Sequence, residues 1–354
     1  KTRIPSLRSF RRGSEKVDVK FDPGCPDGHI SRCGQTAATF NATSLCAFVA
    51  NVDPSVCVVA TKGHGDEHDD HEAWDRKVAE EGPVKMLDLH DEHAHHDDDR
   101  EAQRLAKEVR VLIWVMTSPK NLQVKAKVVR DTWGKRANKL IFFSSETDKN
   151  FPTIGLNVSE GREHLTAKTM QGFRYVYEHH FDDADWFMKA DDDTYVILEN
   201  LRYFLSGEDN MKPVFFGHHF KTIVKQGYYS REPSVCRQDG GAEDAEFGKC
   251  MERLGVLTAN TTDALGRSRF HCFDPETHLF GGYPGWYYNY DANGARKGTE
   301  SVSDYAITFH YVSPQKMQAL EFYIYHLSPY GIINGKQDLN KPEAEKKPIS
   351  FTHR

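Results

Sequence analysis

The chain has 354 residues, of which 28% are charged, and its formal net charge at neutral pH is −6. That length allows one large domain or two modest ones with a substantial buried core, and the acidic balance offers no basic footprint for nucleic acid. The seven cysteines form no CxxC pair, so neither a zinc ribbon nor a redox motif is indicated.

Two segments precede the part of the chain with regular periodicity. Residues 1–61 are rich in Gly, Ser, Pro and Cys, and we expect an irregular stem region there. Residues 62–100 include KGHGDEHDDHEAWDRK and LHDEHAHHDDDRE, which offer too little apolar surface to offset the entropy lost on ordering. We therefore expect an acidic, His-rich disordered linker that the folded domain does not need for stability. Its histidines could chelate a metal ion, although no ligand spacing repeats.

Strands and helices alternate from residue 101 onwards. Apolar runs that predict buried strands lie at 109–116, 140–143, 186–190, 214–217 and 306–312. Segments with helical spacing of apolar side chains lie at 122–136, 165–177, 196–205, 243–254 and 314–326. This alternation predicts an α/β domain at 101–333 with a mostly parallel sheet flanked by helices, followed by a polar tail at 334–354.

Three consecutive aspartates, Asp191, Asp192 and Asp193, follow the apolar strand 186–190. Ligands of open α/β sheets bind outside the carboxyl ends of the strands, and adjacent carboxylates repel one another unless a cation lies between them. Asp191 and Asp193 lie on one side of an extended backbone, so together they can hold a hard divalent ion that bridges to diphosphate oxygens. The alternative is an acidic turn without a ligand.

The segment 186–196 resembles the metal-binding Asp-x-Asp motif of the β-1,3-glycosyltransferase family, especially its core 1 β-1,3-galactosyltransferases. Further blocks agree in order over about residues 105–333, namely VMTSP, RDTWG, GAED with GKC, FHYVSP and HLSPYGI. The resemblance implies a GT-A fold, Mn²⁺, a UDP-sugar donor and inversion at the anomeric carbon. It also implies residence in the Golgi, with a type II membrane anchor that is not visible in this chain; a homodimer is one option.

The resemblance assigns catalytic roles to residues in two of these blocks. Inverting transfer needs a base that takes the proton from the attacking hydroxyl, and Asp244, with Glu243 beside it, matches the base of the family. The alternative is a pair of carboxylates at a helix start, where negative charge is favourable. His310 matches the position that gives the ion a nitrogen ligand, although a lone histidine on a strand is more often a core residue.

Donor contacts are expected at the end of the first strand of the domain. Thr117, Ser118 and Pro119 should border the uridine, and Asp192 should lie beside them. Lys125 or Arg130 could reach the donor phosphates, although basic side chains on a helix are more often simply solvated.

Acceptor contacts are expected from an aromatic loop. Five aromatic residues follow Phe280 in a stretch rich in Gly and Pro, and aromatic rings suit the C–H faces of sugars. We take Tyr283, Trp286 and Tyr288, together with Tyr228, as candidate acceptor residues. An ordinary packed loop is the alternative.

The chain departs from the family after Ser230. The family continues there with a Gly-Gly-Ala-Gly-Tyr segment and a helix, whereas this chain passes directly to Arg231. If the helix is absent, activity is in doubt. A cysteine that normally precedes the last strand is also replaced, around 301–303. Cys236 and Cys250 remain on either side of Asp244, and we hypothesise a disulfide between them that braces it.

The secretory signals of the chain are limited. Sequons begin at Asn41, Asn157 and Asn260 and fit a secretory compartment. The longest apolar stretch, 44–60, is interrupted by polar residues and a proline, so it is a poor candidate for a membrane span.

The sequence therefore predicts transfer of galactose from UDP-galactose, in β-1,3 linkage, to N-acetylgalactosamine (GalNAc) on Ser or Thr of glycoproteins. One rival is transfer of another sugar, such as N-acetylglucosamine. A second rival is a catalytically inactive lumenal relative that acts as a binding or folding partner. A third, a His-rich metal-buffering protein, rests only on residues 64–96.

Overall fold

The computed structural model describes residues 10–12, 15–17, 56–59, 69–80, 82–87, 99–221 and 236–327. The chain divides into two units, residues 1–42 and 43–354. In the first unit, β1 (Phe10–Arg12) and β2 (Glu15–Val17) pair antiparallel. The second unit contains all the candidate site residues.

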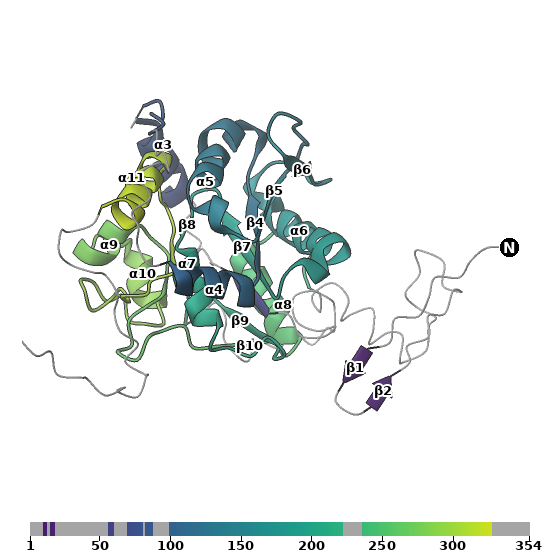
Figure 1. The fold of residues 1–354 in the computed structure, drawn as a ribbon. Helices are drawn as coiled ribbons and strands as arrows, with labels where there is room; N and C mark the ends of the chain where they lie inside the picture. The colour runs from purple at the N-terminus through teal and green to yellow at the C-terminus, as the bar shows by residue number, and fades with distance from the viewer. Residues whose placement is uncertain are drawn as a thin grey trace, which may run out of the picture. The chain divides into compact units, whose positions relative to one another are not determined.

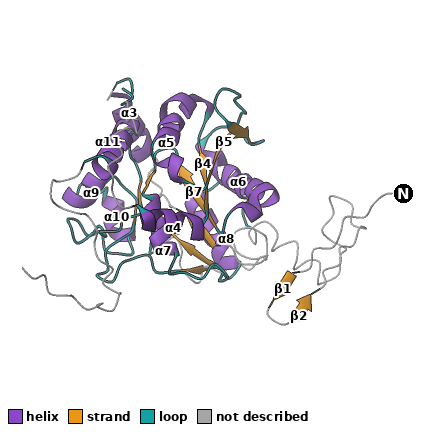
Figure 2. Ribbon diagram, viewed as in Figure 1, coloured by secondary structure: helices purple, strands orange, loops and turns teal. Residues whose placement is uncertain are grey.

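A sheet with the strand order β10-β9-β3-β7-β4-β5-β6 is the centre of the second unit (Figure 1). Each neighbouring pair in it is parallel, and helices flank it (Figure 2). Its strands are β3 (Val56–Val59), β4 (Val111–Met116), β5 (Lys139–Ser144), β6 (Thr153–Gly155), β7 (Trp186–Asp191), β9 (Val214–Phe216) and β10 (Leu257–Thr258). The predicted α/β fold with a mostly parallel sheet is confirmed.

The helices of this unit agree with most of the predicted ones. They are α3 (Asp69–Glu80), α4 (Arg100–Glu108), α5 (Lys127–Asp131), α6 (Leu165–His180), α7 (Leu198–Leu205), α8 (Glu243–Arg253), α9 (Pro275–Phe280), α10 (Gly285–Tyr290) and α11 (Pro314–Tyr325). The helix predicted at 122–136 is continuous only over α5, with a π-helical turn before it and a 3₁₀ turn after it. No helix in the described ranges combines the length and apolar character that a membrane span requires.

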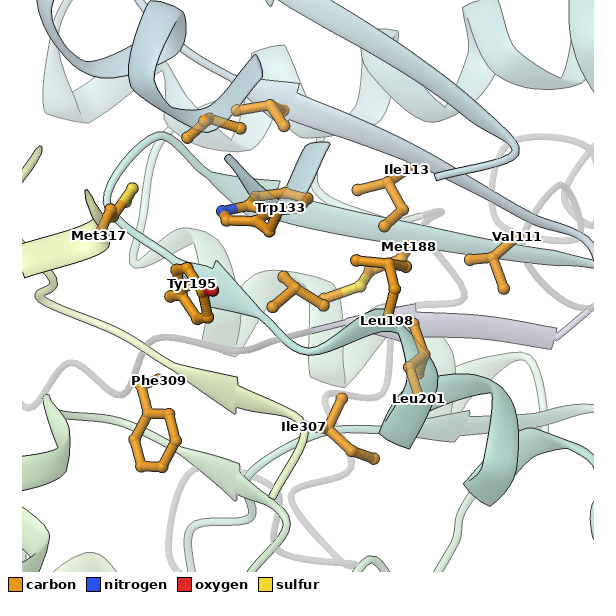
Figure 3. Packing of buried hydrophobic residues seen from close by; sticks show 14 of the residues in the cluster. Val111, Ile113, Trp133, Met188, Tyr195, Leu198, Leu201, Ile307, Phe309 and Met317 are labelled. Carbon is orange, nitrogen blue, oxygen red and sulfur yellow. The ribbon is translucent and has the colours of Figure 1, made fainter. Parts of the chain in front are cut away.

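Strand β4 separates two hydrophobic cores. All of its residues are buried, and successive side chains of a strand point to opposite faces. Val111, Ile113 and Val115 pack into one core with apolar residues of α5 and α7 (Figure 3). Trp114 points into the other core, where its ring lies 5.0 Å from that of Phe173 in α6. Both faces of the sheet are therefore covered, as the continuous apolar run of β4 requires.

A second, smaller sheet carries a distant part of the chain to the end of β7. Its strands are β8 (Tyr195–Val196), β11 (Phe270–His271) and β12 (Thr308–Phe309), in the order β11-β12-β8. β12 pairs antiparallel with β8, and β8 begins two residues after the aspartate cluster. The residue after β12 is His310, so this pairing places the histidine beside the aspartates.

The expectations for the N-terminal segments are wrong at two places. Within the predicted irregular stem, β3 is an interior strand that pairs with β7 on one side and β9 on the other. Within the predicted disordered linker, α3 is a helix, and among its residues 74–80, whose side chains are described, Trp74 and Val78, one turn apart, are half-buried. Both elements have tertiary partners: β3 pairs with two strands of the sheet, and Trp74 of α3 packs against Tyr311. Residues 62–68, 88–98 and 334–354 lie outside the described ranges.

Candidate metal and catalytic site

Three possible metal ligands meet at the carboxyl end of β7. Asp191 is the last residue of β7, Asp193 lies in the following turn, and His310 follows β12. One ligand atom from each lies within 4.8 Å of the other two. His310 Nδ1 is 3.2 Å from Asp193 Oδ1 and 3.0 Å from Thr194 Oγ1. Two carboxylates and one imidazole form a donor set that suits a divalent ion such as Mn²⁺.

Asp192 holds the turn and is not part of that group. Its Oδ2 accepts hydrogen bonds from Thr117 Oγ1 at 2.7 Å and from Asn121 Nδ2 at 2.9 Å. Burial, against the opposing effect of Lys125, raises the pKa of Asp192 to about 6. These bonds tie the aspartate cluster to the segment after β4, where the donor contacts were predicted.

Lys189, which was not among the predicted site residues, connects a metal ligand to Glu243, the neighbour of the predicted base. The residue is 1% exposed, and its Nζ lies 2.9 Å from Asp191 Oδ1 and 3.5 Å from Glu243 Oε1. Burial disfavours its charge, but the carboxylates of Asp191, Glu243 and Asp244 outweigh burial and raise the pKa of Lys189. The available signal was a lysine inside an otherwise apolar strand, because a buried lysine is rarely found without a partner.

Asp244 lies in the first turn of α8 beside Glu243, whose Oε1 accepts a hydrogen bond from Thr169 at 2.6 Å. Burial and the neighbouring Glu243 charge raise the pKa of Asp244 well above its usual value. Its Oδ2 is buried and has no hydrogen-bond partner among the described residues. A carboxylate with a raised pKa and a free oxygen has the properties of a general base.

The hypothesised disulfide is confirmed. Cys236 and Cys250 are bonded, with their Cα atoms 4.9 Å apart, and they join the segment before α8 to the helix itself. Asp244 therefore lies inside a closed covalent loop, which limits how far the start of α8 can move.

The predicted donor residues have different surroundings. Ser118 Oγ is buried without a hydrogen-bond partner in the described part of the chain, and Pro119 begins a 3₁₀ turn. The Lys125 side chain is 13% exposed, and the carboxylates of Asp192 and Asp193 outweigh burial and raise its pKa. Arg130 is instead engaged by Asp131 at 2.8 Å and lies over the Phe151 ring.

The predicted aromatic acceptor loop is largely interior. Its second half forms helix α10, and Tyr283 and Trp286 are buried in a small aromatic cluster. The Tyr283 hydroxyl is 2.9 Å from His278 Nδ1 and donates to the carbonyl of Arg296 at 2.9 Å. Tyr283 and Trp286 therefore match the alternative, an ordinary packed loop. Tyr288 is 55% exposed, and Tyr228 lies outside the described ranges.

Comparison with known proteins gives consistent matches over this region. A family model described as Fringe-like matches residues 106–259, which include the aspartate cluster and Asp244. Glycoprotein-N-acetylgalactosamine 3-beta-galactosyltransferase 1 of Xenopus laevis is 39% identical over 280 residues, covering 73% of this chain and 78% of that protein. Human chondroitin sulfate synthase 3 is 26% identical over 40% of this chain and 20% of its own length. Mouse beta-1,3-glucosyltransferase is 25% identical over 42% and 35%, respectively.

Proposed function

The chain belongs to the β-1,3-glycosyltransferase family that includes the glycoprotein-N-acetylgalactosamine 3-β-galactosyltransferases, and from that membership we propose its reaction. It transfers galactose from UDP-galactose, with inversion, in β-1,3 linkage to GalNAc on Ser or Thr of glycoproteins. The observation that carries this proposal is that Lys189 contacts both Asp191, in the metal-ligand group, and Glu243, the neighbour of Asp244.

In this proposal Asp191, Asp193 and His310 hold Mn²⁺. When bound, the ion supplies a Lewis acid that neutralises the charge of the diphosphate leaving group. Asp244 takes the proton from the acceptor hydroxyl at Oδ2, the buried oxygen without a partner in the described residues. Lys189 positions the Asp191 carboxylate, because it donates to Oδ1 of that ligand.

The donor pocket in this proposal is built around the end of β4. Thr117 holds Asp192 and thereby the turn that carries the metal ligands. Ser118 Oγ, which is buried and has no partner among the described residues, would hydrogen-bond to the donor. Lys125 adds a positive charge beside Asp192 and Asp193, where the phosphates would lie.

Location in the Golgi lumen is part of the same proposal. Of the three sequons, those at Asn157 and Asn260 are described, and both asparagines are exposed, so both are open to glycosylation in the secretory pathway. The membrane anchor and a homodimer are carried over from the family alone.

A second candidate function is a catalytically inactive relative with the same fold. The observation in its favour is that the family's Gly-Gly-Ala-Gly-Tyr segment does not follow Ser230 in this chain. Such a protein would bind UDP and Mn²⁺ at the same residues and transfer no sugar.

UDP release with a panel of UDP-sugars tests these alternatives. The panel is run with and without a GalNAc-peptide and with and without Mn²⁺. We expect release from UDP-galactose only when peptide and Mn²⁺ are both present, and a β-1,3-linked product. Release from UDP-N-acetylglucosamine in its place would change the assigned donor. Mn²⁺-dependent UDP binding without transfer to any acceptor would support the inactive relative.

A further inference from the structure

Helix α3 contacts residues at the candidate donor site, although it comes from the segment that precedes the predicted catalytic domain. In Figure 1, α3 lies beside α11. Trp74 on its buried face meets Tyr311, with ring centroids 5.5 Å apart at an angle of 67°. Tyr311 directly follows His310, and the centroids of those two rings are 4.5 Å apart. The indole of Trp74 is therefore one aromatic ring away from a candidate metal ligand.

The backbone at Tyr311 is strained. Its φ is +55°, a left-handed conformation that is an outlier for a bulky aromatic residue. Such strain persists only where the surroundings hold the residue in place, and the ring is stacked on Phe273 at 5.7 Å. The face that α3 contacts is therefore a fixed part of the domain.

Lys125 is shared between α3 and the aspartate cluster. Its Nζ lies 3.2 Å from Asp75 Oδ1 and 4.7 Å from the centre of the Trp74 ring. The carboxylates of Asp192 and Asp193 also act on this ammonium group and raise the pKa of Lys125. One ammonium group thus interacts both with a carboxylate of α3 and with the aspartate cluster that includes a candidate metal ligand.

We propose that helix α3 is a strap across the donor site, and that Asp75 competes with the diphosphate of the donor for Lys125. The proposal rests on the proposed function, because it takes the ligand to be a nucleoside diphosphate bound with a divalent ion. The carboxylate of Asp75 repels another anion near the same ammonium, so the diphosphate must displace it. The Lys125 side chain is 13% exposed, but that of Asp75 is 53% exposed, so water can solvate the carboxylate of Asp75 when this contact opens.

The chain after α3 is anchored to the domain, so the helix can move away from Lys125 while the residues that follow it stay in place. Gly82 has a φ of +80° and turns the chain at the end of α3. Beyond it, Lys85 N donates to Gln315 Oε1 at 3.2 Å, and Gln318 Nε2 donates to the carbonyl of Lys85 at 3.1 Å. Val84 packs against the main core. The chain that follows the strap is therefore tethered to α11.

The test compares the affinity for UDP in the presence of Mn²⁺, measured by calorimetry, in three proteins. Asp75→Asn removes the competing charge, and we expect UDP to bind about two- to fivefold more tightly, the range of a single exposed ion pair. Glu80→Gln is the matched control, because it removes one negative charge from an exposed position of the same helix; we expect no change. The gain should shrink at high salt.

Two further measurements report on the strap itself. In a Lys125→Met background, Asp75→Asn should have no effect, since the two residues act through one contact. Tryptophan emission should change when UDP and Mn²⁺ bind, because α3 leaves Lys125 and the surroundings of Trp74 change. Trp74→Phe should remove that change.

The outcomes separate this proposal from the proposed function. Wild-type protein that binds no UDP with Mn²⁺ would overturn the donor site and the strap together. Wild-type binding with equal affinities in Asp75→Asn and Glu80→Gln, or weaker binding in Asp75→Asn, would overturn the strap alone. Tryptophan emission that does not change when UDP binds would also overturn the strap alone.

Discussion

Lys189 Nζ donates a hydrogen bond to Asp191 Oδ1 at 2.9 Å from inside the central sheet. The same ammonium lies 3.5 Å from Glu243, the neighbour of the proposed base Asp244. Lys189 is therefore a buried cation shared by carboxylates that come from β7 and from α8. The stability of the folded protein and the pKa of Asp244 should both depend on this lysine.

Replacing Lys189 with Met should destabilise the protein by about 3–5 kcal/mol, because it leaves buried carboxylates without a counter-charge. Lys139→Met is the matched control, since its ion pair with Asp183 is much more exposed, and it should cost about 1 kcal/mol or less. Urea unfolding of the metal-free proteins measures both effects. Equal effects of the two substitutions would show that Lys189 is not the buried counter-charge of the site.

The double substitution Asp191→Asn and Asp193→Asn should abolish Mn²⁺-dependent UDP binding while the fold is kept. Amides lack the charge that attracts the ion, and the mutual repulsion of the carboxylates is removed as well. Calorimetry measures binding, and circular dichroism checks the fold. Glu300→Gln, at an exposed position, controls for the loss of negative charge. Unchanged UDP affinity in the double variant would disprove the metal site.

Asp244→Asn should lower sugar transfer by about 10²–10⁴-fold, the usual contribution of a general base. UDP affinity should stay the same, because the substitution removes no donor contact. Glu246→Gln is the control, since Glu246 lies in the same first turn of α8 and has a comparable interaction with the helix dipole. If Asp244 is only a helix-start carboxylate, both variants will lose up to about 1 kcal/mol of stability and keep their turnover.

Transfer should decline on the acid side at a pH well above 3.8, the ordinary pKa of an aspartate. The base acts only when deprotonated, and burial together with Glu243 raises the pKa of Asp244, so protonation begins at higher pH. Glu243→Gln removes the repulsion and should move this limb of the kcat/KM profile to lower pH. Lys189→Met removes a cation that favours the carboxylate and should move it to higher pH. If neither substitution moves the acidic limb of the kcat/KM profile, a group other than Asp244 titrates there.

Val58→Pro should destabilise the protein by about 3 kcal/mol or more, because Val58 lies in an interior strand between Met188 of β7 and Phe216 of β9. Thr258→Pro is the control. It lies in the edge strand β10. The backbone N–H groups of Leu257 and Ala259, on either side of it, donate to the carbonyls of Pro213 and Phe215, so the N–H of Thr258 points away from β9. Proline is tolerated at such edge positions. Equal melting temperatures of the two variants would show that β3 does not contribute to the sheet.

The sequence by itself predicted the parts of this protein that depend on neighbouring residues in the chain. An apolar run followed by three aspartates specifies a buried strand with acidic groups at its end, because strand burial and side-chain alternation are local properties. The start of α8 at Glu243 and the α/β alternation were predictable for the same reason. His310 was identified through the resemblance, since one histidine after a strand carries no local signal.

Only the tertiary structure decided which residues meet across long separations. Lys189 is the counter-charge of the site because α8 brings Glu243 and Asp244 to β7, and no spacing in the sequence encodes that distance. β3 and α3 come from segments in which no ordered element was predicted, and they are ordered because β3 pairs with β7 and β9 and because Trp74 of α3 packs against Tyr311. Tyr283 and Trp286 look like a sugar-binding platform in the sequence, but their neighbours bury them. Burial is a property of the partners that a residue meets, and those partners are set by the packing of the whole domain.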